Sequence, residues 1–169
     1  MVRELIESGV NLSVQDNEGT CALKEACWQN HKKIVELLIE KGANLNTVDK
    51  NGDTPLLIAC RRDNIDIVKM LVKKGANLEL QNKEGITLLM EACWRGNQDI
   101  VKILVNKGVN VEVKNSYGFT ASDIAAARGY DNIVKILTGA KEKNKIDISL
   151  LREKTAKSTI NKTQEQNLG

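Results

Sequence analysis

A pattern that recurs every 33 residues constrains this chain more than any other feature. Glycines stand in register at Gly19, Gly52, Gly85 and Gly118, and alanines at Ala26, Ala59, Ala92 and Ala125. The pair Ile-Val recurs at 34–35, 67–68, 100–101 and 133–134. A period of this length is typical of a solenoid, in which one small structural unit is stacked many times. We therefore expect a repeat array without a single central core.

Each unit has the pattern of two short helices joined by turns. In the second complete unit, Thr54 can cap a helix with its hydroxyl, and Pro55 suits the first helical position, where its missing N–H needs no partner. Asn64 and Asp66 are start signals for a second helix. Gly75 stands where a left-handed residue ends that helix. The predicted order is turn, short helix, second helix and loop.

Two motifs in this unit resemble those of the ankyrin-repeat family. TPLLIA at 54–59 is similar to the family's TPLHxA signature, and IVKMLVKKGA at 67–76 resembles its IVxxLLxxGA element. The resemblance implies an all-α fold, a solenoid of stacked helix–turn–helix units with projecting β-turn fingers. It covers an expected domain, 1–140, with a partial repeat at 1–15, repeats at 16–48, 49–81, 82–114 and 115–140, and a tail at 141–169.

The two ends of the chain differ from the repeats. Residues 1–14 match the second half of a unit, which favours a fragment of a longer protein over a degenerate N-terminal cap. Ser122 and Asp123 make the last repeat more polar, as a terminal cap requires. The tail has seven basic and four acidic residues and no aromatic one. This composition predicts a weakly basic, disordered segment, with one short helix near 146–151.

The charge balance argues against nucleic acid as a partner. The chain carries 25 basic and 22 acidic residues, a net charge of +3, and the tail accounts for all of it. The repeats are therefore neutral and lack the basic field that nucleic-acid binding requires. No stretch approaches the ~20 apolar residues of a membrane span. We expect a monomer whose partner is a protein or peptide.

Three cysteines share one position of the repeat. Cys27, Cys60 and Cys93 occupy it, and Ala126 fills it in the last unit. Either they form a row of metal or redox ligands, or they are small side chains where helices approach closely. Neighbouring helices lie about 8–10 Å apart, too far for a disulfide or for one shared zinc ion. We expect buried, reduced thiols without metal. With Cys21 also unpaired, they indicate an intracellular location, in the cytoplasm or also the nucleus.

No pattern in the chain predicts an enzyme. His31, the only histidine, lies one turn beyond Cys27, and such a pair could form a nucleophile. However, Cys27 is expected to be buried, and no third group would orient His31. The chain also lacks a phosphate-binding glycine loop and a cluster of metal ligands. We therefore expect neither catalysis nor a cofactor.

The few aromatic residues point to a binding surface. Trp28 and Trp94 share one position at the end of the first helix, and none of the five aromatics falls on a core position. The ankyrin resemblance implies that this position and the next face a concave groove edged by the fingertips. The predicted partner-binding residues are Trp28, Gln29, Arg61, Arg62, Trp94, Arg95 and Arg128 in the groove, with Ile86, Tyr117 and Phe119 on the fingers.

Two functions fit this surface. Trp, Tyr and Arg contribute most to interface energies, which favours a scaffold or adaptor that binds a partner protein without chemistry. The alternative is a receptor for a small anionic or nucleotide-like ligand, stacked on a tryptophan and clamped by arginine. Glu25 and Glu91 lie near the same face. If they pair with the arginines, the alternative becomes weaker.

Overall fold

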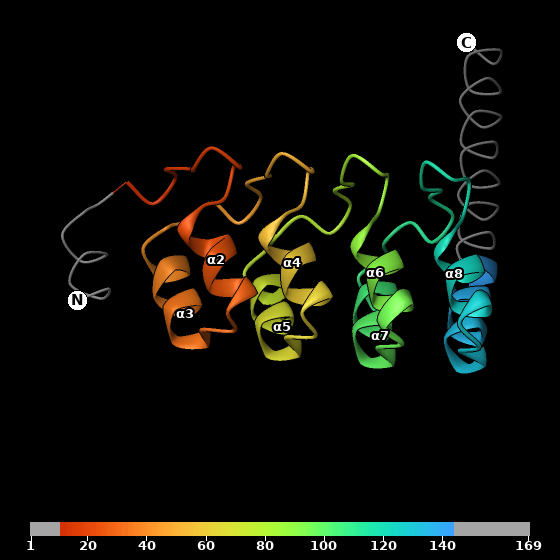
Figure 1. Cartoon of the computed structure of the whole chain (residues 1–169). Helices are drawn as coiled ribbons and strands as arrows, with labels where there is room; N and C mark the ends of the chain where they lie inside the picture. The colour runs from red at the N-terminus through yellow and green to blue at the C-terminus, as the bar shows by residue number, and fades with distance from the viewer. Residues whose placement is uncertain (1–10, 144–169) are drawn as a thin grey trace, which may run out of the picture.

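The fold is a row of helix pairs, seen in a computed structural model that describes residues 11–143 (Figure 1). The inner helix of each pair is followed at once by the outer one. The pairs are α2 (Ala22–Trp28) with α3 (Lys32–Glu40), α4 (Pro55–Arg61) with α5 (Ile65–Lys73), α6 (Leu88–Arg95) with α7 (Gln98–Asn106), and α8 (Ala121–Ala127) with a helix over 131–143. Within the described residues there is no β-strand beyond one isolated bridge, Gln15 to Cys21. The predicted all-α repeat architecture is confirmed.

The last helix continues through residue 143, three residues past the predicted end of the repeat domain. The remainder of the predicted tail, with its short helix near 146–151, lies outside the described residues, as does most of the partial first repeat. The expected disorder of the tail therefore stays a prediction.

Threonine starts the inner helices in three of the four repeats. The hydroxyls of Thr54 and Thr87 accept hydrogen bonds from backbone N–H groups three residues later, at 3.1 and 3.2 Å. Thr120 does the same and forms a capping box with Asp123. Cys21 holds this position in the first repeat and makes no such bond. Pro55 occupies the first turn of α4, as predicted.

The second helix of the repeat at 49–81 begins directly after Asn64, as predicted, and the Asn64 side chain contacts the preceding repeat. Asn64 precedes α5 without capping it, because its amide donates to the carbonyl oxygen of Cys27 in the preceding repeat at 2.7 Å. Asn97, at the same position one repeat later, does cap its helix by accepting from the N–H of Ile100. Asn64 therefore stands at the start of α5, as predicted, and its side chain in addition links this repeat to the preceding one.

The fingers are the turns that precede the inner helices, such as 49–53 and 82–86. Three glycines of the 33-residue series stand where one finger touches the next, namely Gly19, Gly52 and Gly85. Gly52 has a left-handed φ of 80°, and a Cβ placed on it would lie 3.0 Å from Cα of Asn82 in the next finger. The N–H of Lys83 donates to the carbonyl oxygen of Asn51 at 2.8 Å across the same contact. Side chains at position 52 would push these backbones apart, so the register keeps glycine there.

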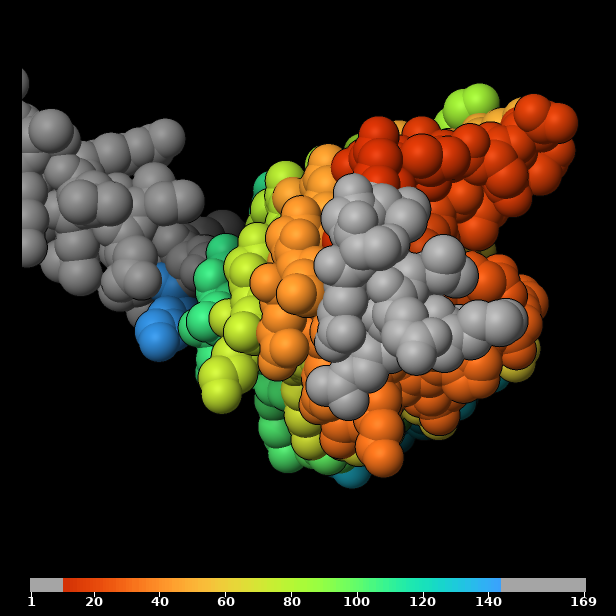
Figure 2. Space-filling view, turned by 90° about the vertical axis from the view of Figure 1, so that its left-hand side faces the viewer, coloured from red at the N-terminus to blue at the C-terminus, as the bar shows by residue number. Residues whose placement is uncertain are grey.

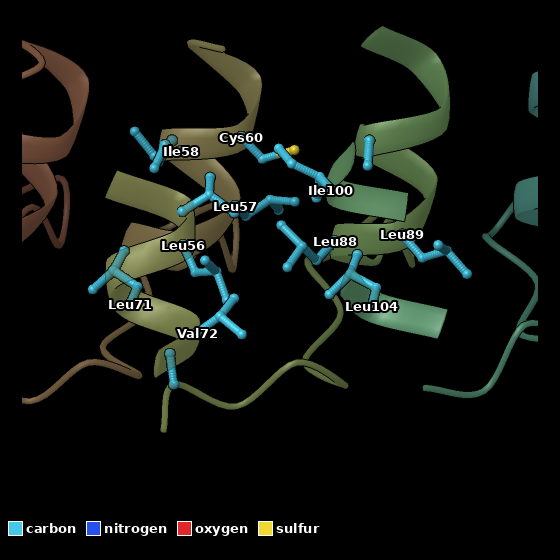
Figure 3. Packing of buried hydrophobic residues seen from close by; sticks show 14 of the residues in the cluster. Leu56, Leu57, Ile58, Cys60, Leu71, Val72, Leu88, Leu89, Ile100 and Leu104 are labelled. Carbon is cyan, nitrogen blue, oxygen red and sulfur yellow. The ribbon is translucent and has the colours of Figure 1, made fainter. Parts of the chain in front are cut away.

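Apolar side chains between successive helix pairs form the core. Figure 3 shows Leu56, Val72 and Leu88, from three helices of two repeats, filling this space. Cys27, Cys60 and Cys93 are all buried in the same core, which confirms their predicted burial. Each repeat packs only against its neighbours. The side of the inner helices that faces away from the outer helices is therefore not covered by any other described part of the chain.

Candidate functional site

Two neighbouring clefts lie between the fingers and the inner helices. The larger, about 580 Å³, is walled by Ile86 and Trp94 and has Met90 in its lining. The smaller, about 400 Å³, lies against Trp28, and Arg61 lines both. We call the two clefts together the groove. Figure 2, a view from the N-terminal side of the row, shows the finger ridge projecting from the helices with a hollow beneath it.

The structure brings most of the predicted binding residues to the groove. Five line the clefts directly, namely Trp28, Arg61, Ile86, Trp94 and Arg95. Arg62 and Arg128 reach the groove through contacts with the two tryptophans, and Gln29 through a hydrogen bond to Glu25. Tyr117 and Phe119 are exposed on the fourth finger and line neither cleft.

Each tryptophan is covered on one side by an arginine from the next repeat. The guanidinium carbon of Arg62 lies 4.5 Å from the ring centroid of Trp28, and that of Arg128 lies 4.5 Å from the ring centroid of Trp94. Such cation–π contacts contribute about 0.5–1 kcal/mol at exposed sites. The indoles remain 42% and 50% exposed. They are thus held in place while still presenting a large surface to solvent.

An ion-pair network built on two buried carboxylates occupies the middle of the groove. Asp53, only 2% exposed, accepts from Arg61 Nη1 at 2.6 Å and from the Asn82 amide at 2.9 Å. Arg61 Nε and Arg95 Nε both donate to the carboxylate of Glu91, at 3.4 and 3.1 Å. We call these five residues the central network. Every charge in it has a partner.

The central network also shifts the pKa of the Arg61 guanidinium. Burial lowers the pKa of this guanidinium, but the hydrogen bonds and charges of Asp53, and then those of Glu91, raise it by more, so the pKa is raised overall. The expected pairing of a glutamate with the arginines is confirmed for Glu91. Glu25 instead accepts from Gln29 Nε2 at 2.9 Å.

Lys24 supplies a second buried charge at the edge of the groove. Its ammonium group binds the carboxylate of Asp49 in the next finger. Burial raises the pKa of Asp49, but the hydrogen bond from Lys24 and two backbone N–H groups lower it by more. Like the arginines of the central network, Lys24 is therefore already paired.

Sequence reasoning missed Asp53 and Asn82. Asp53 has no counterpart in the other repeats, where the same finger position carries Thr20, Ile86 and Phe119, so the repeat pattern gave no signal for it. The stacking of arginine on tryptophan, by contrast, corresponds to a regular spacing in the sequence. In both cases the arginine follows the tryptophan by 34 residues, one more than the repeat length.

The thiols and His31 do not form a reactive site. Burial, and secondarily the nearby Cys21, raises the pKa of Cys27 to about 12. A nucleophilic cysteine needs the opposite shift. His31 is exposed at the start of α3. Among residues 11–143, no group of three or more His, Cys, Asp or Glu side chains is placed to hold a metal ion.

We predict that Cys27, Cys60 and Cys93 react slowly with a thiol reagent at pH 8 in the native protein. Burial raises the pKa of Cys93 to about 12 and also raises that of Cys60, so the reactive thiolates are absent. All three should react within seconds in denaturant, as a time course with a chromogenic disulfide would show. Fast native reaction of all three would contradict their burial.

The same shifts predict the response to alkali. In the unfolded chain, thiols lose their protons above a pKa of about 8.5, whereas the folded thiols keep them. The folded state therefore binds more protons above this pH, and its stability declines as the pH rises from about 8.5 toward 12. Urea unfolding between pH 8 and pH 10 would measure the decline, and replacement of Cys60 by alanine should reduce its slope.

In the part of the chain that the structure describes, none of the helices has the length and hydropathy to cross a bilayer.

A family model described as ankyrin repeats (three copies) matches residues 1–82 and 74–150. No curated protein matched the chain in a sequence search. The two matched ranges together cover most of the sequence, and they contain all four helix pairs, the fingers and the groove. The chain therefore belongs to the ankyrin-repeat family.

Proposed function

We propose that this protein is a scaffold or adaptor that binds a partner protein or peptide in the groove, without chemistry. The observation that carries the proposal is the pair of half-exposed tryptophans, Trp28 and Trp94, each held by an arginine of the next repeat. Ankyrin repeats are, as a family, modules for protein–protein interaction.

The energetics of such a surface suit a protein partner. A tryptophan buries about 150–250 Å² when covered, which makes it a strong anchor. Anchors that are already ordered lose less side-chain entropy on binding. The stacked arginines fix Trp28 and Trp94 before any partner arrives. Tyr117 and Phe119, which are 69% and 54% exposed, would extend the contact along the fourth finger.

The central network argues against the alternative of a small anionic or nucleotide-like ligand. An arginine clamp needs free guanidinium groups to hold a phosphate or carboxylate. Arg61 and Arg95 are instead bound to Asp53 and Glu91, so an incoming anion would have to displace a buried carboxylate. A partner that contacts the tryptophans has no such cost.

We further propose that the protein acts as a monomer inside the cell, in the cytoplasm or nucleus. The support for the location is that four cysteines, Cys21, Cys27, Cys60 and Cys93, are free thiols, as is usual in a reducing compartment. The measured mass in light scattering tests the first point, and imaging of the tagged protein in its own cells tests the second.

The test is replacement of Trp94 by alanine. Because Trp94 is half exposed, the free energy of unfolding should fall by only about 1–2 kcal/mol, from the covered half of the indole and the cation–π contact. Affinity for a partner should fall by about 2 kcal/mol or more if Trp94 is an anchor. The partner is first captured with the full chain and identified by mass spectrometry. Its affinity for parent and variant is then measured by calorimetry with purified proteins.

Val48→Ala is the control, since Val48 is 45% exposed but lines neither cleft. It should leave the affinity unchanged. Arg95→Ala is less suitable, because it would remove a partner of the buried Glu91 and disturb folding as well as binding. If Trp94→Ala and the parent bind the partner equally well, the groove is not the binding site.

A further inference from the structure

The groove contains the same short sequence twice. Glu-Ala-Cys-Trp occurs at 25–28 and again at 91–94, two repeats apart, whereas the repeat between them has Ile-Ala-Cys-Arg at 58–61. The last repeat has Ile-Ala-Ala-Ala at 124–127. The inner helices thus have a period of two units on their groove side, in addition to the 33-residue period of the fold.

The structure places matching neighbours around both copies. Trp28 lies under Arg62 and Trp94 under Arg128, with the same distance of 4.5 Å between guanidinium carbon and ring centroid. The two indoles are exposed to similar extents. We call these pairs the first and second Trp–Arg sites. They are two copies of one surface element, and α4 lies between the helices that carry them, in contact with both (Figure 1).

Three of the cations in the described part of the groove are already paired with carboxylates, and Lys83 at the finger edge of the larger cleft is not. Arg61 and Arg95 are bound to Asp53 and Glu91 within the central network, and Lys24 is bound to Asp49. Arg62 and Arg128 lie against the indoles. Each site therefore presents a half-exposed indole with an exposed guanidinium on one of its faces. The groups that complement the exposed indole are bulky apolar side chains.

We propose that the two Trp–Arg sites bind two bulky apolar side chains of one partner segment, separated by the distance of two repeats. With neighbouring helices about 8–10 Å apart, this separation is about 16–20 Å. It corresponds to about 11–13 residues of a partner helix at 1.5 Å per residue. In an extended partner it is about 5–6 residues. The proposal rests on the proposed function and specifies the partner's chemistry.

The test uses a phage-displayed library of random 16-residue peptides, selected against the full chain. This length spans the two sites whether a peptide binds as a helix or extended. Enriched peptides should carry two bulky apolar positions at one of the two spacings. The affinities of synthetic copies are then measured for the parent, Trp28→Ala, Trp94→Ala and the double variant. Circular dichroism melts establish that each variant is folded.

Each single replacement should lower the affinity at least 10-fold, and the double replacement at least 100-fold. A double-mutant cycle provides the decisive comparison. Consider a peptide whose Trp28-contacting apolar residue is replaced by alanine. The Trp28→Ala variant should bind this peptide and the unchanged peptide with equal affinity, because the contact is already lost. The Trp94→Ala variant should bind the altered peptide more weakly than the unchanged one. Replacement of the other anchor should give the opposite result, because each anchor meets one tryptophan.

The outcomes separate this proposal from the proposed function. If peptides depend on only one tryptophan, or carry a single apolar anchor, the two-site proposal is wrong and the groove remains the binding surface. If they depend on neither tryptophan, or if no peptide is enriched, both are wrong for this surface. Enrichment of acidic peptides whose binding weakens steeply with salt would also overturn the apolar assignment.

Discussion

Replacing Ile100 with alanine is expected to lower the free energy of unfolding by about 2–5 kcal/mol. Ile100 lies near the start of α7, is fully buried, and belongs to the core between successive repeats. The shorter side chain leaves a cavity that neighbouring helices fill only in part, so packing is lost together with the transfer free energy. Urea unfolding followed by circular dichroism measures the loss.

Lys102→Ala is the control for this prediction, since Lys102 is exposed on the same helix. It should change the free energy of unfolding by less than about 0.5 kcal/mol. Equal effects of the two replacements would mean that α7 does not pack as described. The loss from Ile100→Ala should also lower the stability of the whole array, because each repeat depends on its neighbours.

The second large effect is expected for Asp53→Ala, at about 2–3 kcal/mol. Asp53 is buried and accepts hydrogen bonds from Arg61 and Asn82. Its removal leaves the Asn82 amide without this acceptor and deprives Arg61 of its shortest ion pair. The value lies below that of a fully buried pair, because Arg61 is partly exposed and keeps Glu91. Unfolding in urea at neutral pH provides the measurement.

Asp66→Ala is the matched control, because Asp66 also pairs with a cation, Lys32 at 3.1 Å, but on the surface. Exposed ion pairs contribute about 0–1 kcal/mol, so the loss should be small. If Asp53→Ala were no more costly than Asp66→Ala, the central network would contribute nothing to stability. The groove would then owe its shape to the apolar core alone.

The central network also bears on recognition. Arg61 occupies the position that Trp28 holds in the preceding repeat and Trp94 in the following one. The middle of the groove therefore presents a paired charge, and its two ends each present an indole. Asp53 and Glu91 neutralise the charge of Arg61 through their ion pairs with it. The partner we propose therefore meets apolar surface at two points and a satisfied polar surface between them.

The sequence by itself determined the repeat, the helices and the buried positions. Each unit carries its own local signals, such as the Thr54 cap, Pro55 and the left-handed Gly75, all of which occur as predicted. A register repeated four times makes these signals reinforce one another. The burial of the cysteines followed in the same way, because a position shared with alanine accepts only a small side chain.

Only the tertiary structure decided which groove residues touch. Arg62 and Trp28 are 34 residues apart, Arg61 and Glu91 are 30 apart, and Asn64 reaches Cys27 across 37. Each of these contacts joins two repeats, so it depends on how far one helix pair is displaced and rotated against the next. That offset is set by the packing of the whole core. No local pattern in one repeat records it, which is why the sequence offered no indication of the Asp53 ion pair or of the bond from Asn64 to Cys27.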